Sequence, residues 1–113
     1  MHPDISFEEF AKVEFRSGTV VKAEPFPKAR KPAYKIWVDF GPEIGIKQTS
    51  AQVTINYTLE NLIGKNVIGC VNLGTKNIAG FTSEFLLVGF EDASGAISLA
   101  RPDAKVPNGK KLH

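Results

Sequence analysis

The residues best able to do chemistry in this sequence gather in one glycine-bearing connection between two strongly apolar segments. Residues 67–73 and 85–90 are apolar runs bounded by turn residues, which is typical of strands buried on both faces. Gly74 and Gly80 allow the connection a positive φ and a close approach of its backbone. Rigid strands that end in such a loop position binding groups well. The polar groups suit hydrogen bonding and contact with anions, and belong to Asn72, Lys76, Asn77, Ser83 and Glu84.

A second row of hydrogen-bonding side chains belongs to the strand expected over residues 46–55. Successive side chains of a strand point to opposite faces, and one of the two sets here is wholly neutral and polar. Such a row suits a ligand-binding face, and it suits a hydrated sheet face equally well. Its members are Gln48, Ser50, Gln52, Thr54 and Asn56.

Residues 25–32 form a basic, proline-rich stretch with one aromatic residue, Phe26. Proline fixes φ and lacks an amide proton, so the stretch is expected to be a stiff irregular loop. The loop is either solvated or a phosphate-binding edge, and the residues leave both interpretations open. Its cations are Lys28, Arg30 and Lys31.

Catalysis is not expected, and neither is a metal or a cofactor. His2 and His113 lie near the two ends of the sequence, where positioning is poor, so a histidine-based triad or metal site has no foundation. Asp39 and Glu43 flank a turn and are better interpreted as surface charges than as an acid–base pair. The single cysteine, Cys70, is expected to be a small buried residue.

The elements that position these groups begin with a helix. Ser6 followed by Glu9 is a capping box, in which each residue satisfies a free amide of the other, and it predicts a helix over residues 7–12. Its apolar stripe, which includes Phe7 and Phe10, would pack either on the chain's own barrel or on a second copy.

Five strands are expected, over residues 16–24, 33–40, 46–55, 67–73 and 85–90. Gly18 suggests a bulge in the first strand. Thr58 can cap one helical turn between the third and fourth strands, and Ser94-Gly95 closes a hairpin into residues 97–100. This order predicts an all-β, five-stranded OB-fold barrel with a short N-terminal helix and a C-terminal extension.

The composition indicates one domain, over residues 1–113, with a net charge of +2 and a pI near 8.7. Any affinity for nucleic acid must therefore come from local clusters of cations. No apolar run approaches the roughly 20 residues needed to cross a bilayer, so membrane insertion is not expected. No signal peptide is recognisable, and a cytoplasmic location is the default expectation.

The polar connection carries a spaced pattern: Asn72-Leu73, Lys76-x-Ile78-x-Gly80 and Ser83-Glu84. This pattern resembles the signature of the tRNA-binding domain family, which includes the C-terminal domain of methionyl-tRNA synthetases, the EMAP-II-type cytokine precursors and stand-alone bacterial proteins. Residues 15–20, 23–29 and 57–65 are also similar to the family. Synthetase-type members usually carry Ser-Glu-Gly-Met, whereas residues 83–86 read Ser-Glu-Phe-Leu, which looks most like the CsaA secretion-chaperone branch.

The resemblance implies a non-catalytic binding domain, with tRNA or structured RNA as one ligand and unfolded or export-bound polypeptides as another. A module that only recruits a synthetase or another partner is the alternative. The expected RNA contacts are Arg30, Lys31, Lys47, Gln48, Ser50, Gln52, Asn72, Lys76 and Ser83. The expected polypeptide contacts are exposed aromatic residues: Phe26, Trp37, Phe81 and Phe85. The resemblance also implies a homodimer formed through residues 1–13, with Phe7 and Phe10 in its interface, and through residues 97–113.

Overall fold

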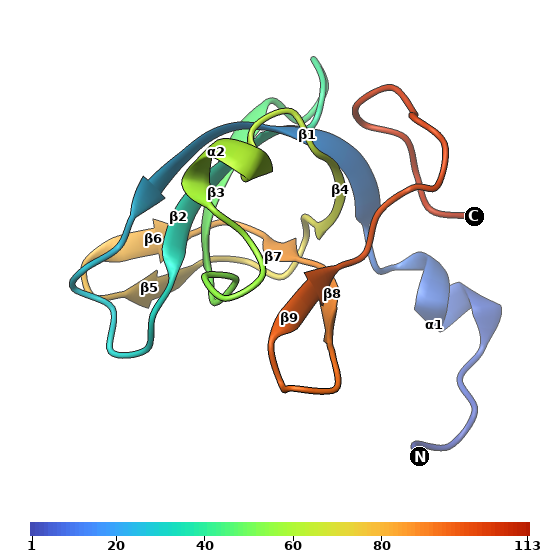
Figure 1. Ribbon diagram of the computed structural model, residues 1–113. Helices are drawn as coiled ribbons and strands as arrows, with labels where there is room; N and C mark the ends of the chain where they lie inside the picture. The colour runs from blue at the N-terminus through green and yellow to red at the C-terminus, as the bar shows by residue number, and fades with distance from the viewer.

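The computed structural model describes all residues from 1 to 113, and its centre is a nearly closed antiparallel barrel (Figure 1). The expected OB-like, all-β fold is confirmed. The main sheet has the strand order β3-β2-β1-β4-β7. These strands are β1 (Phe15–Pro25), β2 (Tyr34–Asp39), β3 (Ile46–Ala51), β4 (Asn66–Cys70) and β7 (Leu86–Leu87).

The barrel core follows from the alternation of residues along β2. Ile36, Val38 and Phe40 point inward and have no exposed surface, and they pack with Val20, Leu62 and Val67. Burying an aliphatic side chain of this size contributes roughly 1.5–3 kcal/mol. The intervening residues Lys35 and Trp37 are half-buried on the outer face, as the alternation predicts.

Two glycines allow the strands to approach one another. A Cβ added to Gly18 would lie 2.5 Å from Val38 Cγ1, and one added to Gly69 would lie 2.5 Å from Phe40 Cζ. The expected bulge at Gly18 is wrong, because the register shift in β1 lies between Val20 and Lys22. Gly18 instead makes room for the core side chains of β2.

Both expected helices are present with the expected caps. In α1 (Phe7–Ala11) Ser6 Oγ accepts the amide of Glu9, and the Glu9 carboxylate accepts the amide of Ser6. In α2 (Leu59–Leu62) Thr58 and Asn61 form the same reciprocal pair. The helix α1 buries none of its residues, and Phe10 contacts the barrel at Phe15 of β1.

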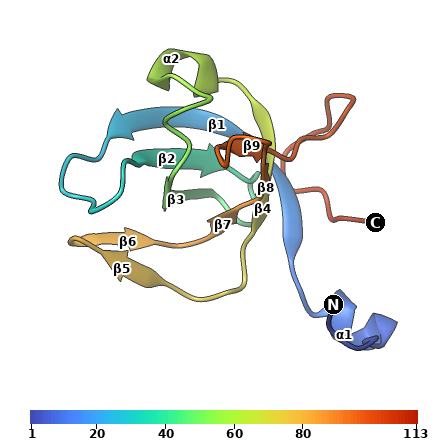
Figure 2. The same cartoon turned by 60° about the horizontal axis from the view of Figure 1, so that its bottom comes forward.

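The polar connection is not an irregular loop but a hairpin. Its strands are β5 (Lys76–Ile78) and β6 (Phe81–Ser83), which project from the barrel in Figure 2. Ala79 and Gly80 form the turn with φ of 49° and 85°, and positive φ at both central residues is the property of a type I′ turn.

The third and fifth strands differ from their expected lengths. β3 ends at Ala51 rather than Ile55, and residues 85–90 are divided between β7 and β8 (Gly89–Glu91). The latter pairs with β9 (Ile97–Leu99), which confirms the hairpin at Ser94-Gly95.

The C-terminal tail runs beside the first half of β1. Ser17 N donates to Lys110 O at 2.9 Å, Gly109 N donates to Ser17 O at 2.7 Å, and Arg16 forms a β-bridge with Lys111. The buried Arg16 guanidinium secures the tail by donating to Gly109 O at 3.1 Å. Both termini therefore lie at the end of the molecule opposite the β5–β6 hairpin, as Figures 1 and 2 show.

Candidate nucleic-acid interface

The Ser83-Glu84 pair closes the barrel along the free edge of β3. Ser83 Oγ accepts a hydrogen bond from Ser50 N at 3.0 Å, and its oxygen lies 3.2 Å from Ser50 Oγ. Glu84 Oε1 accepts from Gln48 N at 3.0 Å, and Glu84 N donates to Gln48 O at 2.8 Å. The Gln48 side chain also donates to Thr82 O at 2.9 Å. Three of the expected RNA contacts, Gln48, Ser50 and Ser83, therefore help to close the barrel: Ser50 bonds to Ser83, and Gln48 bonds to Thr82 and Glu84.

Asn72 has a similar structural task at the other end of the connection. Its Oδ1 accepts from Glu14 N at 2.9 Å, and its Nδ2 donates to Lys12 O at 2.6 Å. The side chain thus fixes the segment between α1 and β1 against the end of β4. It has no hydrogen bond with the basic loop described next.

The basic loop, defined here as residues 26–33 between β1 and β2, lies against the β5–β6 hairpin. The two surround a hollow of about 220 Å³ lined by Arg30, Lys31, Gln52 and Ile78, together with Ala29 and Ala33. The loop carries three cations and no carboxylate. The structure therefore brings together three of the expected RNA contacts, Arg30, Lys31 and Gln52.

Lys47 and Lys76 are placed apart from this hollow. Lys47 lies opposite Val38 in the sheet register, so it shares the inward-facing row of β3 with Thr49. Lys76 is exposed at the start of β5 and lines a different hollow, of about 300 Å³, with Leu73 and Leu86.

An aromatic cluster stands beside the basic loop on the outer face of β2. The ring of Phe81 meets Phe26 and Trp37 edge-on, with centroid distances of 5.5 and 5.9 Å. Lys35 Nζ lies 5.1 Å from the centroids of both Phe26 and Phe81, and Lys22 Nζ lies 4.6 Å from that of Trp37. A cation at this distance from a ring face is attracted by its quadrupole.

Two of the expected polypeptide contacts are not exposed. Phe85 is 5% exposed and packs edge-on against Phe40 in the core, with ring centroids 4.9 Å apart. Phe26 is also 5% exposed, because Phe81 covers it. The expectation that all four aromatics form an exposed apolar surface is therefore wrong, and Trp37 and Phe81 are the two that reach the surface in part.

Three further cations of this face, Lys22, Lys28 and Lys35, were missed in the expected set. Lys28 belongs to the charged loop and Lys35 alternates with the core residues of β2, so both were accessible to pattern analysis. Lys22 was not, because the register shift after Val20 decides which way it points.

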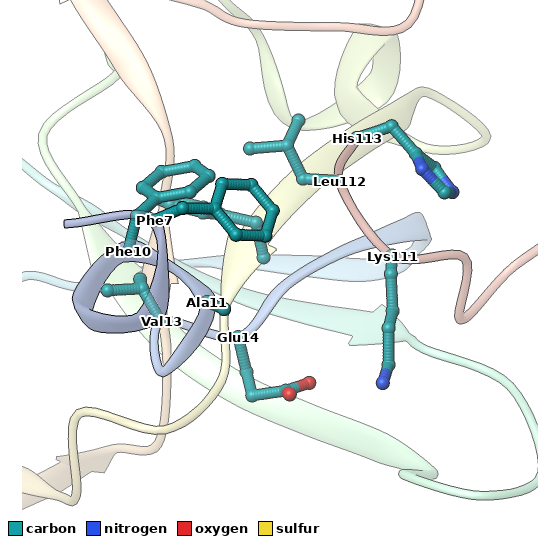
Figure 3. Close-up of a pocket in the computed structure, with 9 residues that line it drawn as sticks. Phe7, Phe10, Ala11, Val13, Glu14, Lys111, Leu112 and His113 are labelled. Atoms are coloured by element: carbon teal, nitrogen blue, oxygen red, sulfur yellow. The ribbon is translucent and has the colours of Figure 1, made fainter.

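A separate apolar hollow lies between α1 and the C-terminal tail, and Figure 3 shows the residues that line it. The ring centroids of Phe7 and Phe10 are 6.4 Å apart, and those of Phe10 and Phe15 are 6.5 Å apart. Leu112 of the tail closes the far side of a volume of about 290 Å³. Phe7 is 81% exposed, so much of its ring has no partner in the chain.

One carboxylate of the molecule has a clearly altered acidity. Asp92, in the β8–β9 turn, accepts hydrogen bonds from Asn56 Nδ2 at 3.0 Å and Ser94 Oγ at 2.7 Å. These bonds favour the ionised form and lower the pKa of Asp92 from 3.8 to about 2. Asp92 thereby joins the hairpin to the segment after β3 and has no contact with the basic loop.

None of the helices is both long and apolar enough to span a bilayer. The family model that matches the chain is described as "Putative tRNA binding domain" and covers residues 15–111. Its limits coincide with the first residue of β1 and with Lys111, the bridge partner of Arg16. The matched unit is thus the barrel with its tail.

Solved structures with the same fold include two described as CsaA chaperones. That of Bacillus anthracis has a TM-score of 0.91 and 42% identity, covering 98% of this chain and 100% of its own. That of Picrophilus torridus has a TM-score of 0.90 and 40% identity, covering 97% and 100%. A MetRS-related protein from Pyrococcus horikoshii has a TM-score of 0.85 and 28% identity, covering 99% and 100%.

The curated relatives include the methionine–tRNA ligase of Methanospirillum hungatei, which is 37% identical over 110 residues. The match takes in 97% of this chain and 16% of that enzyme, so the chain spans about a sixth of the length of the ligases that it resembles. On the family match and these relatives together, the chain belongs to the tRNA-binding domain family.

Proposed function

We propose that this chain is a non-catalytic binding protein for tRNA or similarly structured RNA, with the cytoplasm as its compartment. The observation that carries the proposal is the basic loop held against the β5–β6 hairpin, with Arg30 and Lys31 around one hollow. The family match to a tRNA-binding domain supports the same ligand.

The loop provides the kind of contact that phosphate groups require. Lys28, Arg30 and Lys31 are close in sequence on a loop whose backbone is stiffened by Pro27 and Pro32, so less backbone entropy is lost when they bind. Gln52 adds an exposed amide, which can exchange hydrogen bonds with a base or a ribose. No acidic residue of the loop opposes an approaching phosphate.

The test is fluorescence anisotropy of labelled bulk tRNA over a salt series. The variant replaces Lys28, Arg30 and Lys31 with alanine, and the charge-matched control replaces the exposed Lys12, Lys105 and Lys110 of the opposite end. The loop variant is expected to bind more weakly and to reduce the slope of log affinity against log salt by about two. Equal losses in the two variants, or no binding by the unaltered protein at low salt, would overturn the proposal.

The terminal hollow supports a homodimer as part of the same proposal. Phe7, Phe10 and Leu112 present adjoining apolar surface without a partner in the chain, and a two-fold contact is the commonest way to cover such a surface. Sedimentation velocity at micromolar concentration tests it. The unaltered protein should be a dimer and the Phe7→Ser, Phe10→Ser variant a monomer, whereas Phe90→Ser, at an exposed phenylalanine elsewhere, should have no effect.

Chaperone-type binding of unfolded or export-bound polypeptides is a second candidate, favoured by the same exposed apolar residues and by the similarity to the CsaA chaperones. Suppression of the aggregation of a chemically reduced model protein tests it directly. If the chain binds neither tRNA nor unfolded polypeptide, the alternative of a recruitment module for an aminoacyl-tRNA synthetase or another partner gains support.

A further inference from the structure

We propose that the hollow between Phe26, Lys35 and the Ala79–Phe81 corner takes a single unpaired nucleobase of the bound RNA, which stacks on Phe81. The inference rests on the proposed function and adds to it the form of RNA that is recognised. The hollow would bind an unpaired base, and the basic loop would bind the phosphates.

The ring of Phe81 is fixed in position before any ligand arrives. The rings of Phe26 from the basic loop and Trp37 from β2 both meet it edge-on, with centroid distances of 5.5 and 5.9 Å. Phe81 is the first residue of β6, directly after the hairpin turn, and its side chain remains half-exposed. Phe26 and Trp37, from two other segments of the chain, thus hold the ring of Phe81 in place beside the hollow. Stacking on a fixed aromatic side chain is how many proteins hold unpaired bases.

The size of the hollow and its lining fit one base with an attached phosphate. Its volume is about 290 Å³, many times the roughly 10–15 Å³ that a cavity needs to hold one water molecule. Lys28 and Lys35 line it together with Phe26 and Phe81, and no carboxylate does. The remaining wall is Pro27, Ala79 and Gly80, and a Cβ added to Gly80 would meet no atom within 4 Å, so the mouth is open on that side.

The recess favours an unpaired base over a duplex. The hollow is lined by the basic loop on one side and by the hairpin turn on the other, and Phe81 is half-buried between them. A base that is paired and stacked within a helix must first be unpaired and unstacked at a cost in free energy, whereas a base in a loop or bulge is already free to enter the hollow. The charge of Lys28 and Lys35 matches the backbone phosphate that accompanies such a base.

The chain contains one tryptophan, Trp37, and its contact with Phe81 provides a reporter for the experiment. Tryptophan emission is measured while a uridine decamer is added, and again with a blunt RNA duplex of equal total charge. The decamer is expected to change the emission of Trp37 and the duplex to leave it unchanged. The variant Phe81→Leu, which keeps an apolar side chain but has no ring, should weaken decamer binding by about tenfold.

Three further variants make the result specific. Phe81→Tyr keeps the stacking face and should bind as the unaltered protein does. Lys35→Gln should weaken binding of the decamer without unfolding the protein, and so tests the same hollow if Phe81→Leu fails to fold. Phe90→Leu, at an exposed phenylalanine of β8, is the matched control and should have no effect.

The possible failures of the two proposals are distinguishable. If tRNA binds with the salt dependence given above but Phe81→Leu and Lys35→Gln bind the decamer as well as the unaltered protein, the hollow takes no base and only the basic loop binds RNA. The inference is also overturned if decamer and duplex change the Trp37 emission equally. If neither tRNA nor the decamer binds at low salt, the proposed function itself is lost.

Discussion

Ser50 and Ser83 face each other across the closing edge of the barrel, with their hydroxyl oxygens 3.2 Å apart and the amide of Ser50 donating to the same Ser83 oxygen at 3.0 Å. No strand pairs with β3 along this edge. Side chains of the Ser83-Glu84 pair and the amide of Glu84 take the place of a neighbouring strand here, so a motif expected to hold a ligand also has a structural role.

The two serines should not be equivalent when replaced by alanine. Ser83→Ala leaves the half-buried amide of Ser50 without an acceptor, at a cost of about 1–3 kcal/mol. Ser50→Ala loses only the contact between hydroxyls, since Ser83 Oγ can still accept from residue 50. Urea unfolding of the two variants checks this order, and equal losses would contradict the assignment of Ser83 as the acceptor.

Gly69 should not tolerate a methyl group. The added Cβ of Gly69→Ala would lie 2.5 Å from Phe40 Cζ and 3.0 Å from Phe85 Cδ2, and crowding of this kind in a core costs about 1–3 kcal/mol. Phe40→Leu removes the nearer ring, so the double variant should lose less stability than the two single variants predict together. A denaturation cycle over the four proteins measures this coupling, and strict additivity would show that Phe40 is not the obstacle.

Asn72→Ala should release α1 without weakening RNA binding. The variant removes the bonds to Lys12 O and Glu14 N that hold the segment before β1. Amide exchange is expected to become faster over residues 7–14 while the barrel amides keep their protection. The tRNA affinity should be unchanged; a clear loss of affinity would restore Asn72 as an RNA contact, as its place in the family pattern suggested.

Asp92 should make the stability of the protein fall in strong acid, below about pH 4. Its pKa is about 2 in the folded chain and ordinarily 3.8, so its contribution is fully present above about pH 4 and is lost as the pH falls toward 2. Asp92→Asn should flatten the dependence of the unfolding free energy on pH across this window. Asp103→Asn, in the C-terminal tail, is the control. If it flattens the pH dependence equally, the hydrogen bonds of Asp92 are not the cause of that dependence.

Much of the fold was accessible from local pattern, because the inward row of β2 is apolar and its outward row is not. The capping box at Ser6 and the cap at Thr58 were also accessible from the sequence, because each involves residues three positions apart, although the part of Asn61 was not foreseen. The β5–β6 hairpin was missed because its strands are short and polar and its turn is Ala79-Gly80 rather than the Asn-Gly or Asp-Gly that favours positive φ.

The candidate site was harder to predict, because its contacts join residues far apart in sequence. Gln48 and Glu84 are 36 positions apart, and the sequence shows that both are polar but not that they satisfy each other. The aromatic cluster depends on the path of the hairpin, which brings Phe81 to Phe26 and Trp37. The cluster of cations on the basic loop is visible in the sequence without any knowledge of the hairpin. Arg30 and Lys31 were proposed as RNA contacts from that cluster alone.

The pairing of the tail with β1 has a consequence for how the chain folds. Ser17 Oγ accepts from Lys110 N across 93 residues of sequence, one of the most distant contacts in the molecule. During synthesis the part of β1 around Ser17 therefore keeps one edge uncovered until residue 110 has left the ribosome. Contacts of such long range slow folding, and an uncovered strand edge is open to pairing with other chains. A shortened chain that ends before Pro107 should accordingly refold with lower yield, through aggregation that begins at β1.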